Sequence, residues 1–163
     1  DKYEIGDRGT DSEALREHKA FLFDKGKNLL VIPVTEVKGK MEYDSRLGYY
    51  RQRLWQGAYV FGLTPEDGFE VKGKITHNEG DEQTDYYYYG SPNAVRRSLY
   101  MDDVLYTISM GKIKANDLDD ISNELKEVKL PYEKQRYGYP YPVKAVGSPG
   151  VAVPEISVSE RVI

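Results

Sequence analysis

Short apolar runs separated by turn residues recur along the first 130 positions. The first pair occupies residues 19–23 and 29–34, and the turn Asp24-Lys25-Gly26-Lys27-Asn28 lies between them. A second pair occupies residues 56–63 and 69–75, and its last run alternates apolar and charged residues as a half-exposed strand does. Runs of this length, bounded by turn residues, predict β-strands rather than helices. We therefore expect a four-stranded antiparallel meander.

The same order then repeats. Residues 97–101 and 104–109 flank a tight Asp102-Asp103 turn, and residues 112–118 and 124–130 follow. Without the insertions at about 35 to 54 and 77 to 93, each unit is roughly 35 to 40 residues long, which is the length of one β-propeller blade. Such a sheet cannot cover its own two faces, so units of this kind stack radially.

The expected fold is therefore all-β: two propeller blades that form the C-terminal part of a larger propeller. The opening residues 1–6 resemble the outer strand of a preceding blade in their alternation. We expect residues 1–131 to hold the blades and residues 132–163 to form an extended tail rich in proline and tyrosine. Proline at four tail positions argues against a central strand, so at most one edge strand is expected, near residues 156–158.

The amino-acid composition excludes several classes of partner and of site chemistry. The 23 basic residues are scattered among 27 acidic ones and the net charge is −4, so we do not expect a nucleic-acid partner. Without cysteine the chain has neither disulfides nor thiolate chemistry. We expect no membrane span in this chain, because no apolar run approaches the length that one needs. The first residues do not resemble a signal peptide, so either the protein is made without one or the start is missing.

Several stretches resemble a known family, the secreted archaeal and bacterial proteins with a C-terminal β-propeller domain distantly related to WD-type repeats. The resemblance spans residues 1 to 131 and is carried by residues 6–15, 18–23, 28–34, 56–61 and 95–118. It implies a location outside the cell or on its surface, and upstream blades that are absent from this chain. It implies no enzymatic activity. The high charge content and the absence of cysteine are also compatible with a heat-adapted source.

Asp11, Ser12 and His18 are the three residue types of a hydrolase triad within one short stretch. The surrounding sequence offers neither a nucleophile elbow nor an oxyanion hole, so we expect no catalytic residues here. The alternative interpretation is structural: these three side chains form a hydrogen-bonded network that fixes successive blades.

Metal ligands are few. His77 is the only other histidine, and a transition-metal site there would depend on carboxylates. Calcium is the better candidate, because residues 81–85 and 116–120 are rich in oxygen ligands, although neither stretch has the spacing of an EF-hand loop. We expect no cofactor, with calcium as the open alternative.

Tyrosine is the one compositional excess, with 15 residues, and Tyr86, Tyr87, Tyr88 and Tyr89 form an unbroken run in the second insertion. Exposed aromatic loops on a rigid scaffold suit recognition of a protein or a carbohydrate. The alternative is that these rings pack against the sheet edge or one another. The insertion at 35–54 mixes both charge signs and is expected to form a long hairpin or an ordered loop, with Trp55 as a packing anchor at its end.

Two functions remain open. The first is a non-catalytic extracellular module that binds a protein or a glycan through residues 35–54 and 77–93, and associates with upstream blades or with itself. The alternative is part of a propeller-scaffold hydrolase whose catalytic residues lie largely in missing blades, with Asp7, Asp11 or Glu13 contributing.

Overall fold

The computed structural model describes residues 1–46, 48–79 and 91–132. Its regular elements are two short 3-10 helices, η1 (Glu13–Leu15) and η2 (His18–Ala20), and eight strands in two sheets. The first sheet contains β1 (Leu22–Asp24), β2 (Leu29–Asp44), β3 (Tyr49–Thr64) and β4 (Gly68–Ile75). The second contains β5 (Arg97–Met101), β6 (Val104–Ile108), β7 (Lys112–Asp117) and β8 (Glu124–Lys129).

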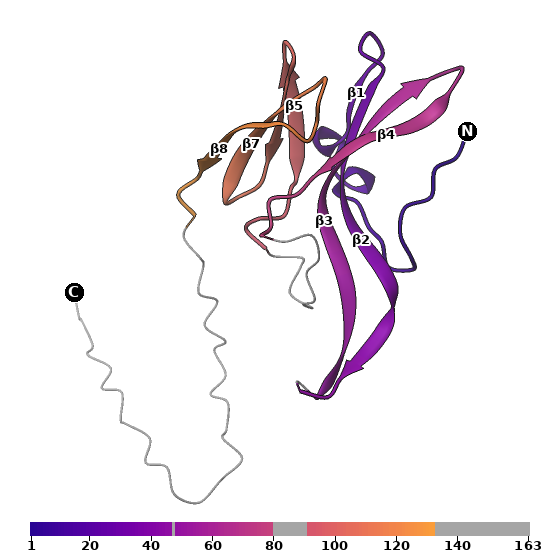
Figure 1. Ribbon diagram of the computed structural model, residues 1–163, viewed down its shortest axis with the longest axis vertical. Helices are drawn as coiled ribbons and strands as arrows, with labels where there is room; N and C mark the ends of the chain where they lie inside the picture. The colour runs from indigo at the N-terminus through magenta and orange to yellow at the C-terminus, as the bar shows by residue number, and fades with distance from the viewer. Residues whose placement is uncertain (47, 80–90, 133–163) are drawn as a thin grey trace, which may run out of the picture. The chain divides into compact units, whose positions relative to one another are not determined.

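Each sheet is a meander in which every strand pairs antiparallel with the next along the chain (Figure 1). The tight turns that open the two sheets hold Asn28 and Asp102 at positive φ, 51° and 53°, a conformation that Asn and Asp tolerate better than most residues. This confirms the predicted all-β fold and its two four-stranded units.

The main apolar core lies between the sheets. Val31, Val60 and Leu105 are among its buried side chains, and Val31 and Val60 from the first sheet pack with Leu105 from the second. Ile121, in the turn between β7 and β8, reaches Gly73 in β4 so closely that a Cβ at Gly73 would lie 2.7 Å from the Ile121 side chain. Each sheet therefore buries one face against its neighbour, as stacked blades do.

Two buried polar contacts fasten the β4–β5 connection to the sheets, one to the first sheet and one to the second. The Gln56 side chain accepts from the Val95 backbone N–H at 2.9 Å and donates to the Val95 carbonyl at 2.8 Å. His77 is fully buried, and its two ring nitrogens lie 2.9 Å from the hydroxyls of Thr107 and Ser109. At the far end of the interface, the Tyr100 hydroxyl donates to Asp24 at 2.5 Å.

The opposite face of the first sheet carries a second apolar cluster, which includes Trp55, Tyr59 and Phe61. The N-terminal residues partly cover it: Ile5 packs on the cluster and the Tyr3 ring meets Phe61 edge-to-face at 5.2 Å. Residues 1–6, all of which the structure describes, form no strand, so the predicted outer strand of a preceding blade is not observed. The alternating side chains of this segment pack on the cluster, and the segment pairs with no strand.

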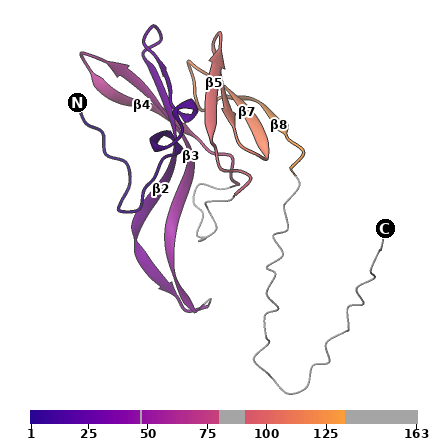
Figure 2. The ribbon, with the colours of Figure 1, turned by 180° about the vertical axis from the view of Figure 1, so that it is seen from behind.

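The outward face of the second sheet is exposed. Leu99, Met101, Leu125 and Val128 are each between 41% and 57% exposed. Figure 2 shows the two sheets from behind. An apolar sheet face left open to water is unusual in a monomer.

Candidate functional site

The antiparallel meanders place several connections at the same end of the strands. The β2–β3 and β4–β5 connections leave from that end, as does the segment that enters β1, whereas the tight β1–β2, β3–β4 and β5–β6 turns lie at the other end (Figure 1). Long connections on a rigid scaffold are where binding residues concentrate. The long-connection end is therefore the part of the fold where a site is expected.

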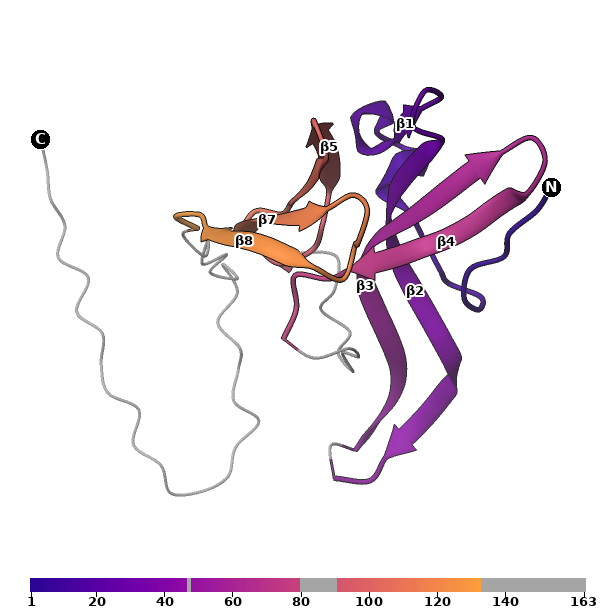
Figure 3. The ribbon, with the colours of Figure 1, turned by 45° about the horizontal axis from the view of Figure 1, so that its top comes forward.

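The dominant feature there is a two-stranded arm, residues 38–53, formed by the ends of β2 and β3 (Figure 3). The pair Lys38↔Arg53 lies at its root and the pair Asp44↔Tyr49 near its tip. β4 pairs with β3 only from Ala58 onward, so the arm extends beyond the rest of the sheet. This confirms the predicted long hairpin in the 35–54 insertion.

One face of the arm is aromatic. Tyr43 and Tyr50 are directly opposite in the register, and their rings form an edge-to-face pair with centroids 5.3 Å apart. They are 58% and 59% exposed, and Met41 beside them is 50% exposed. Large apolar side chains held in a fixed geometry at this exposure suit contact with a partner.

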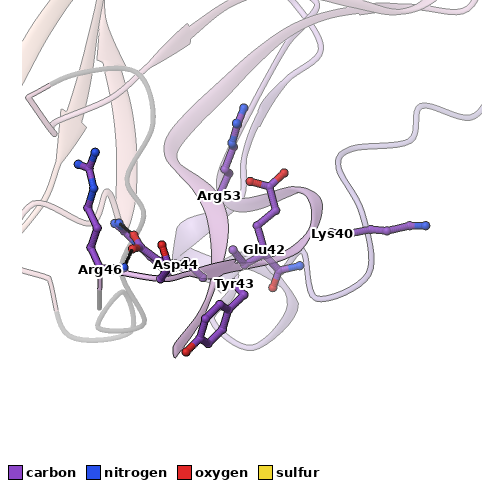
Figure 4. A pocket seen from close by; sticks show the side chains of 9 residues that line it. Lys40, Glu42, Tyr43, Asp44, Arg46 and Arg53 are labelled. Carbon is purple, nitrogen blue, oxygen red and sulfur yellow. Dashed lines mark hydrogen bonds and ion pairs between the residues drawn. The ribbon is translucent and has the colours of Figure 1, made fainter. Parts of the chain in front are cut away.

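The other face is charged, because side chains alternate across a strand. It carries Glu42, Asp44, Arg51 and Arg53, and the Arg51 guanidinium donates to the Asp44 carboxylate at 2.9 Å. Figure 4 shows Glu42 and Arg53 directed to one side of the arm and Tyr43 to the other.

A hollow of about 360 Å³ lies against the arm. This volume falls within the range of small-molecule sites. We call it the arm hollow, and it is lined by Lys40, Glu42, Tyr43, Asp44, Ser45, Arg46, Arg51, Gln52 and Arg53. Eight of these nine side chains are charged or otherwise polar and one is a tyrosine. A lining of this kind favours a ligand that forms many hydrogen bonds over an apolar one.

The root of the arm is held by a buried polar group. The Tyr59 hydroxyl donates to the Glu36 carboxylate at 2.7 Å, and the Lys74 ammonium lies 3.2 Å from the same carboxylate and also contacts the Tyr59 hydroxyl. Lys74 also sits over the rings of Tyr59 and Trp55, at 4.1 and 5.2 Å from their centroids. Burial, and then the Glu36 carboxylate, raise the pKa of Tyr59 well above its usual range. Tyr59 is therefore a donor that fixes the root, and Trp55 is the packing anchor that its sequence position predicted.

The structure does not bring Asp11, Ser12 and His18 together. Asp11 forms a two-pronged ion pair with Arg16, at 2.9 and 2.5 Å. The Ser12 hydroxyl donates to the Pro33 carbonyl at 2.6 Å and accepts from the Ala14 N–H, which caps η1. His18 has a side chain that is 88% exposed and lies 3.5 Å from Glu17. The Ser12 contact fastens the entering segment to β2, the other contacts stay within that segment, and the three side chains do not form the predicted network between blades.

The network between the sheets centres instead on His77, which sequence reasoning considered only as a metal ligand. Burial, and then the charges of Lys114 and Lys112, lower the pKa of His77 to about 4, and Glu127 opposes this shift. A neutral imidazole bonded by two hydroxyls is a structural junction. Its only signal in the sequence was a histidine two residues after a strand that ends at Ile75.

Other predicted residues are placed as follows. Tyr86, Tyr87, Tyr88 and Tyr89 lie outside the described residues, as does the oxygen-rich stretch 81–85 and the predicted tail beyond residue 132. In the stretch 116–120, Asp117 accepts from the Asp119 N–H and Asp120 accepts from the Ser122 N–H, so these carboxylates cap turns. Across the described ranges, no group of three or more histidine and carboxylate side chains is arranged to hold a metal. Nor do these ranges contain a helix long and apolar enough to cross a membrane.

Comparison with known proteins identifies the fold family. Residues 1–121 match the family described as Beta propeller domain. No curated protein and no solved structure matches the chain. The matched region covers both sheets up to the β7–β8 turn, and its repeated four-stranded meanders are the blades of that fold. This chain belongs to the β-propeller domain family.

Proposed function

We propose that the chain is part of a non-catalytic binding module whose partner, a protein or a glycan, is held at the long-connection end of the blades. The observation that supports this most is the arm, because it carries both the exposed Tyr43–Tyr50 pair and the arm hollow, which Tyr43 helps to line. Residues 77–93 leave from the same end and are the second proposed surface, with Tyr86 to Tyr89 contributing. We also propose a location outside the cell or on its surface, which only the family resemblance described above supports.

The alternative function is that of a hydrolase. The contacts of the carboxylates that it would use give this alternative little support. Asp7 accepts from the Gly39 N–H at 2.7 Å, and Asp11 is bound by Arg16. The hydrogen bond from Arg16 lowers the pKa of Asp11, whereas a general acid needs a raised pKa. Asp11 and Glu13 do line a small cavity with Arg16 and Arg96, but its volume is about 60 Å³, too small for a sugar ring or a peptide unit.

The exposed face of the second sheet adds a second kind of partner. We propose that Leu99, Met101, Leu125 and Val128 pack against another blade, supplied by upstream residues or by a second copy of the chain. Sedimentation velocity would show a concentration-dependent dimer in the wild type that Met101→Lys abolishes. The intact mass of the protein in its source cells or medium tests the other route, because upstream blades require a mass well above 18.7 kDa.

Binding through the arm is tested by shortening it. Replacement of residues 39–52 by Asn-Gly joins Lys38 to Arg53 through a two-residue hairpin turn and removes both faces. Full-length wild type and variant would be applied to immobilised arrays of peptides and of oligosaccharides. We expect ligands bound by the wild type to be lost, while the melting temperature stays unchanged. Equal binding by both proteins would contradict the proposal.

A further inference from the structure

The two long edges of the arm differ in what pairs with them. On the β2 side, the segment that enters β1 runs beside the strand where the arm begins. The Asp7 N–H donates to the Val37 carbonyl at 2.8 Å, and the Val37 N–H donates to the Thr10 hydroxyl at 3.0 Å. Asp11 and Thr35 form an antiparallel bridge next to these bonds. The β2 edge is therefore covered at the root of the arm.

The β3 edge has no such cover. β4 pairs with β3 only from Ala58 onward (Figure 3), and the Thr76 hydroxyl donates to the Gln56 carbonyl at 2.7 Å. Gln56 thus directs its carbonyl away from β2. The backbone groups of Leu54 and Gln52 point the same way, because these directions alternate along an antiparallel strand. Within the ranges that the structure describes, no strand pairs with this side of β3 before Ala58, so the edge is open there.

An open strand edge suits one class of partner in particular. It presents N–H and C=O groups at the repeat of a β-strand, and an extended polypeptide presents the matching groups at the same repeat. A glycan has no such backbone. Proteins normally shorten or cover their exposed edges, as the entering segment covers the β2 edge here. The open β3 edge therefore indicates binding of a peptide segment.

The charge of the arm restricts the composition of that segment. Residues 38–53 contain five basic and two acidic residues and so carry +3, while the whole chain carries −4. The remaining residues therefore carry −7. Ion pairs inside the arm, such as Asp44–Arg51, leave this excess unchanged. An acidic segment is attracted to the arm and repelled by the rest of the chain, whereas the arm of a second copy carries the same positive charge and is repelled.

Side chains beside the edge define where the segment should be acidic. Alternation along β3 directs Arg51 and Arg53 to one face of the arm and Tyr50 to the other. Tyr50 is 59% exposed. A strand added at this edge places its own alternate residues on the same two faces. Acidic residues then lie on the face of the arginines, and apolar residues lie on the face of Tyr50.

We propose that the β3 edge of the arm binds an extended segment of a partner protein, in which acidic and apolar residues alternate, as an added strand. This inference rests on the proposed binding function and names a protein as the partner class. The backbone of the segment bonds to the backbone of Leu54 and Gln52. The arm hollow adjoins this edge, because Arg51, Gln52 and Arg53 help to line it, and it gives room for side chains of the segment.

The first test compares heptapeptides by fluorescence anisotropy with the full chain. The peptide Glu-Val-Glu-Tyr-Glu-Val-Glu has the proposed pattern. One comparison peptide has Lys in place of every Glu, and another has the same composition in blocks, Glu-Glu-Glu-Glu-Val-Val-Tyr. We expect the alternating acidic peptide to bind at least tenfold more tightly than either. Raising the salt from 50 to 300 mM NaCl should weaken its binding, because part of the attraction is between charges.

Methylation of the peptide backbone tests the added strand directly. In such a strand, every second N–H bonds to β3 and the others point away. N-methylation of alternate residues should therefore abolish binding in one of the two possible registers and leave it nearly unchanged in the other. Side chains and charge are the same in both methylated peptides, so only strand pairing predicts this difference.

A matched pair of variants tests the edge on the protein. Leu54→Pro removes an N–H that points away from β2, so the pairing with β2 is kept, and proline is tolerated on edge strands. Leu54→Ala also shortens the side chain but keeps the N–H. We expect Leu54→Pro to lower the affinity for the alternating acidic peptide at least tenfold and Leu54→Ala to change it less than twofold. Melting temperatures check that both variants fold.

Four outcomes overturn the inference. These are equal binding of the alternating and blocked peptides, equal effects of the two methylation registers, equal affinity of the two folded Leu54 variants, and a wild-type dimer that Leu54→Pro abolishes. The last would identify a second copy as the occupant of the edge. If the peptide tests fail but the arm-shortened variant still loses an array ligand, the proposed binding function stands and only the added strand is wrong.

Discussion

The two sheets follow the same meander but differ at one corresponding connection. In the first, β2 and β3 are 16 residues each and continue into the arm; in the second, β6 and β7 are five and six residues long and meet through residues 109–111. Outside the arm, the two sheets bury a shared apolar core. No residue of the arm belongs to that core. The comparison distinguishes two parts of the molecule. The body, which is the two sheets without residues 38–53, stabilises the fold, and the arm adds exposed surface. The following predictions test that separation, from the largest expected effect to the smallest.

Removal of the His77 ring should cost the most stability. His77→Ala leaves a cavity at a fully buried position and removes a partner from each of the Thr107 and Ser109 hydroxyls. We expect the free energy of unfolding to fall by about 3–4 kcal/mol, measured by denaturant titration. His18→Ala is the matched control, because that side chain is 88% exposed, and it should change stability by less than about 0.5 kcal/mol. Equal effects would refute a special role for His77.

The same histidine should make stability depend on pH. Its pKa is about 4 in the folded protein and near 6.5 when unfolded, so between these values the unfolded chain binds more protons. The contribution is complete above pH 6.5 and is lost as the pH falls from 6.5 towards 4. A difference of this size corresponds to roughly 3 kcal/mol. The nearby charges of Lys112, Lys114 and Glu127 contribute to the shift.

The measurement compares wild type with His77→Gln at pH 7.5 and pH 4.5. Carboxylates common to both proteins titrate equally, so the difference between the two curves isolates His77. We expect the stability gap between wild type and variant to narrow at pH 4.5. A gap that is constant with pH would show that His77 does not remain neutral in the fold.

Loss of the Gln56 side chain should have an intermediate effect. Gln56→Ala removes two hydrogen bonds to the Val95 backbone and leaves a buried N–H and a carbonyl without those partners. We expect a loss of about 1–3 kcal/mol in the free energy of unfolding. Gln52→Ala, a glutamine in the arm, provides the comparison and should be nearly neutral. Thermal melts of the two variants would show the difference directly.

The smallest stability effect is expected for the arm itself. Replacement of residues 39–52 by Asn-Gly removes the Asp44–Arg51 ion pair and the Tyr43–Tyr50 contact but leaves both apolar clusters intact. A single ion pair at the surface contributes little even when it is half-buried as this one is, and loop length enters closure entropy only logarithmically. We expect a change of less than about 1 kcal/mol. A large loss in the free energy of unfolding would show that the arm contributes to the stability of the two sheets.

Alternating apolar runs and turn residues were enough to predict both meanders, because a period-2 pattern between turn residues specifies a strand and its buried face. Leu105 and Thr107, for example, alternate with half-buried neighbours along β6 as such a pattern requires. The opening residues 1–6 show why pattern alone is insufficient. Their alternation fits a strand, but a strand needs a paired edge, and Tyr3 and Ile5 pack on the Phe61 cluster without one.

The candidate site was only partly predictable. The insertion at 35–54 stood out by its length, yet its pattern did not show that Tyr43 meets Tyr50 or that Glu42 and Arg51 share the opposite face. That division depends on the register, which shifts between Lys38 and Glu42. The proximity of Asp11, Ser12 and His18 in sequence was misleading, because a change of direction through η1 and η2 leaves His18 in solvent.

By itself, the sequence determined the fold family, the order of the strands and the positions where long connections interrupt the repeat. These are local properties, set by side-chain alternation and turn residues within a few positions of one another. Only the tertiary structure decided which polar residues meet. Residues 30 or more positions apart, such as His77 with Thr107 and Gln56 with Val95, come together because one sheet packs on the next, and no local pattern encodes that distance.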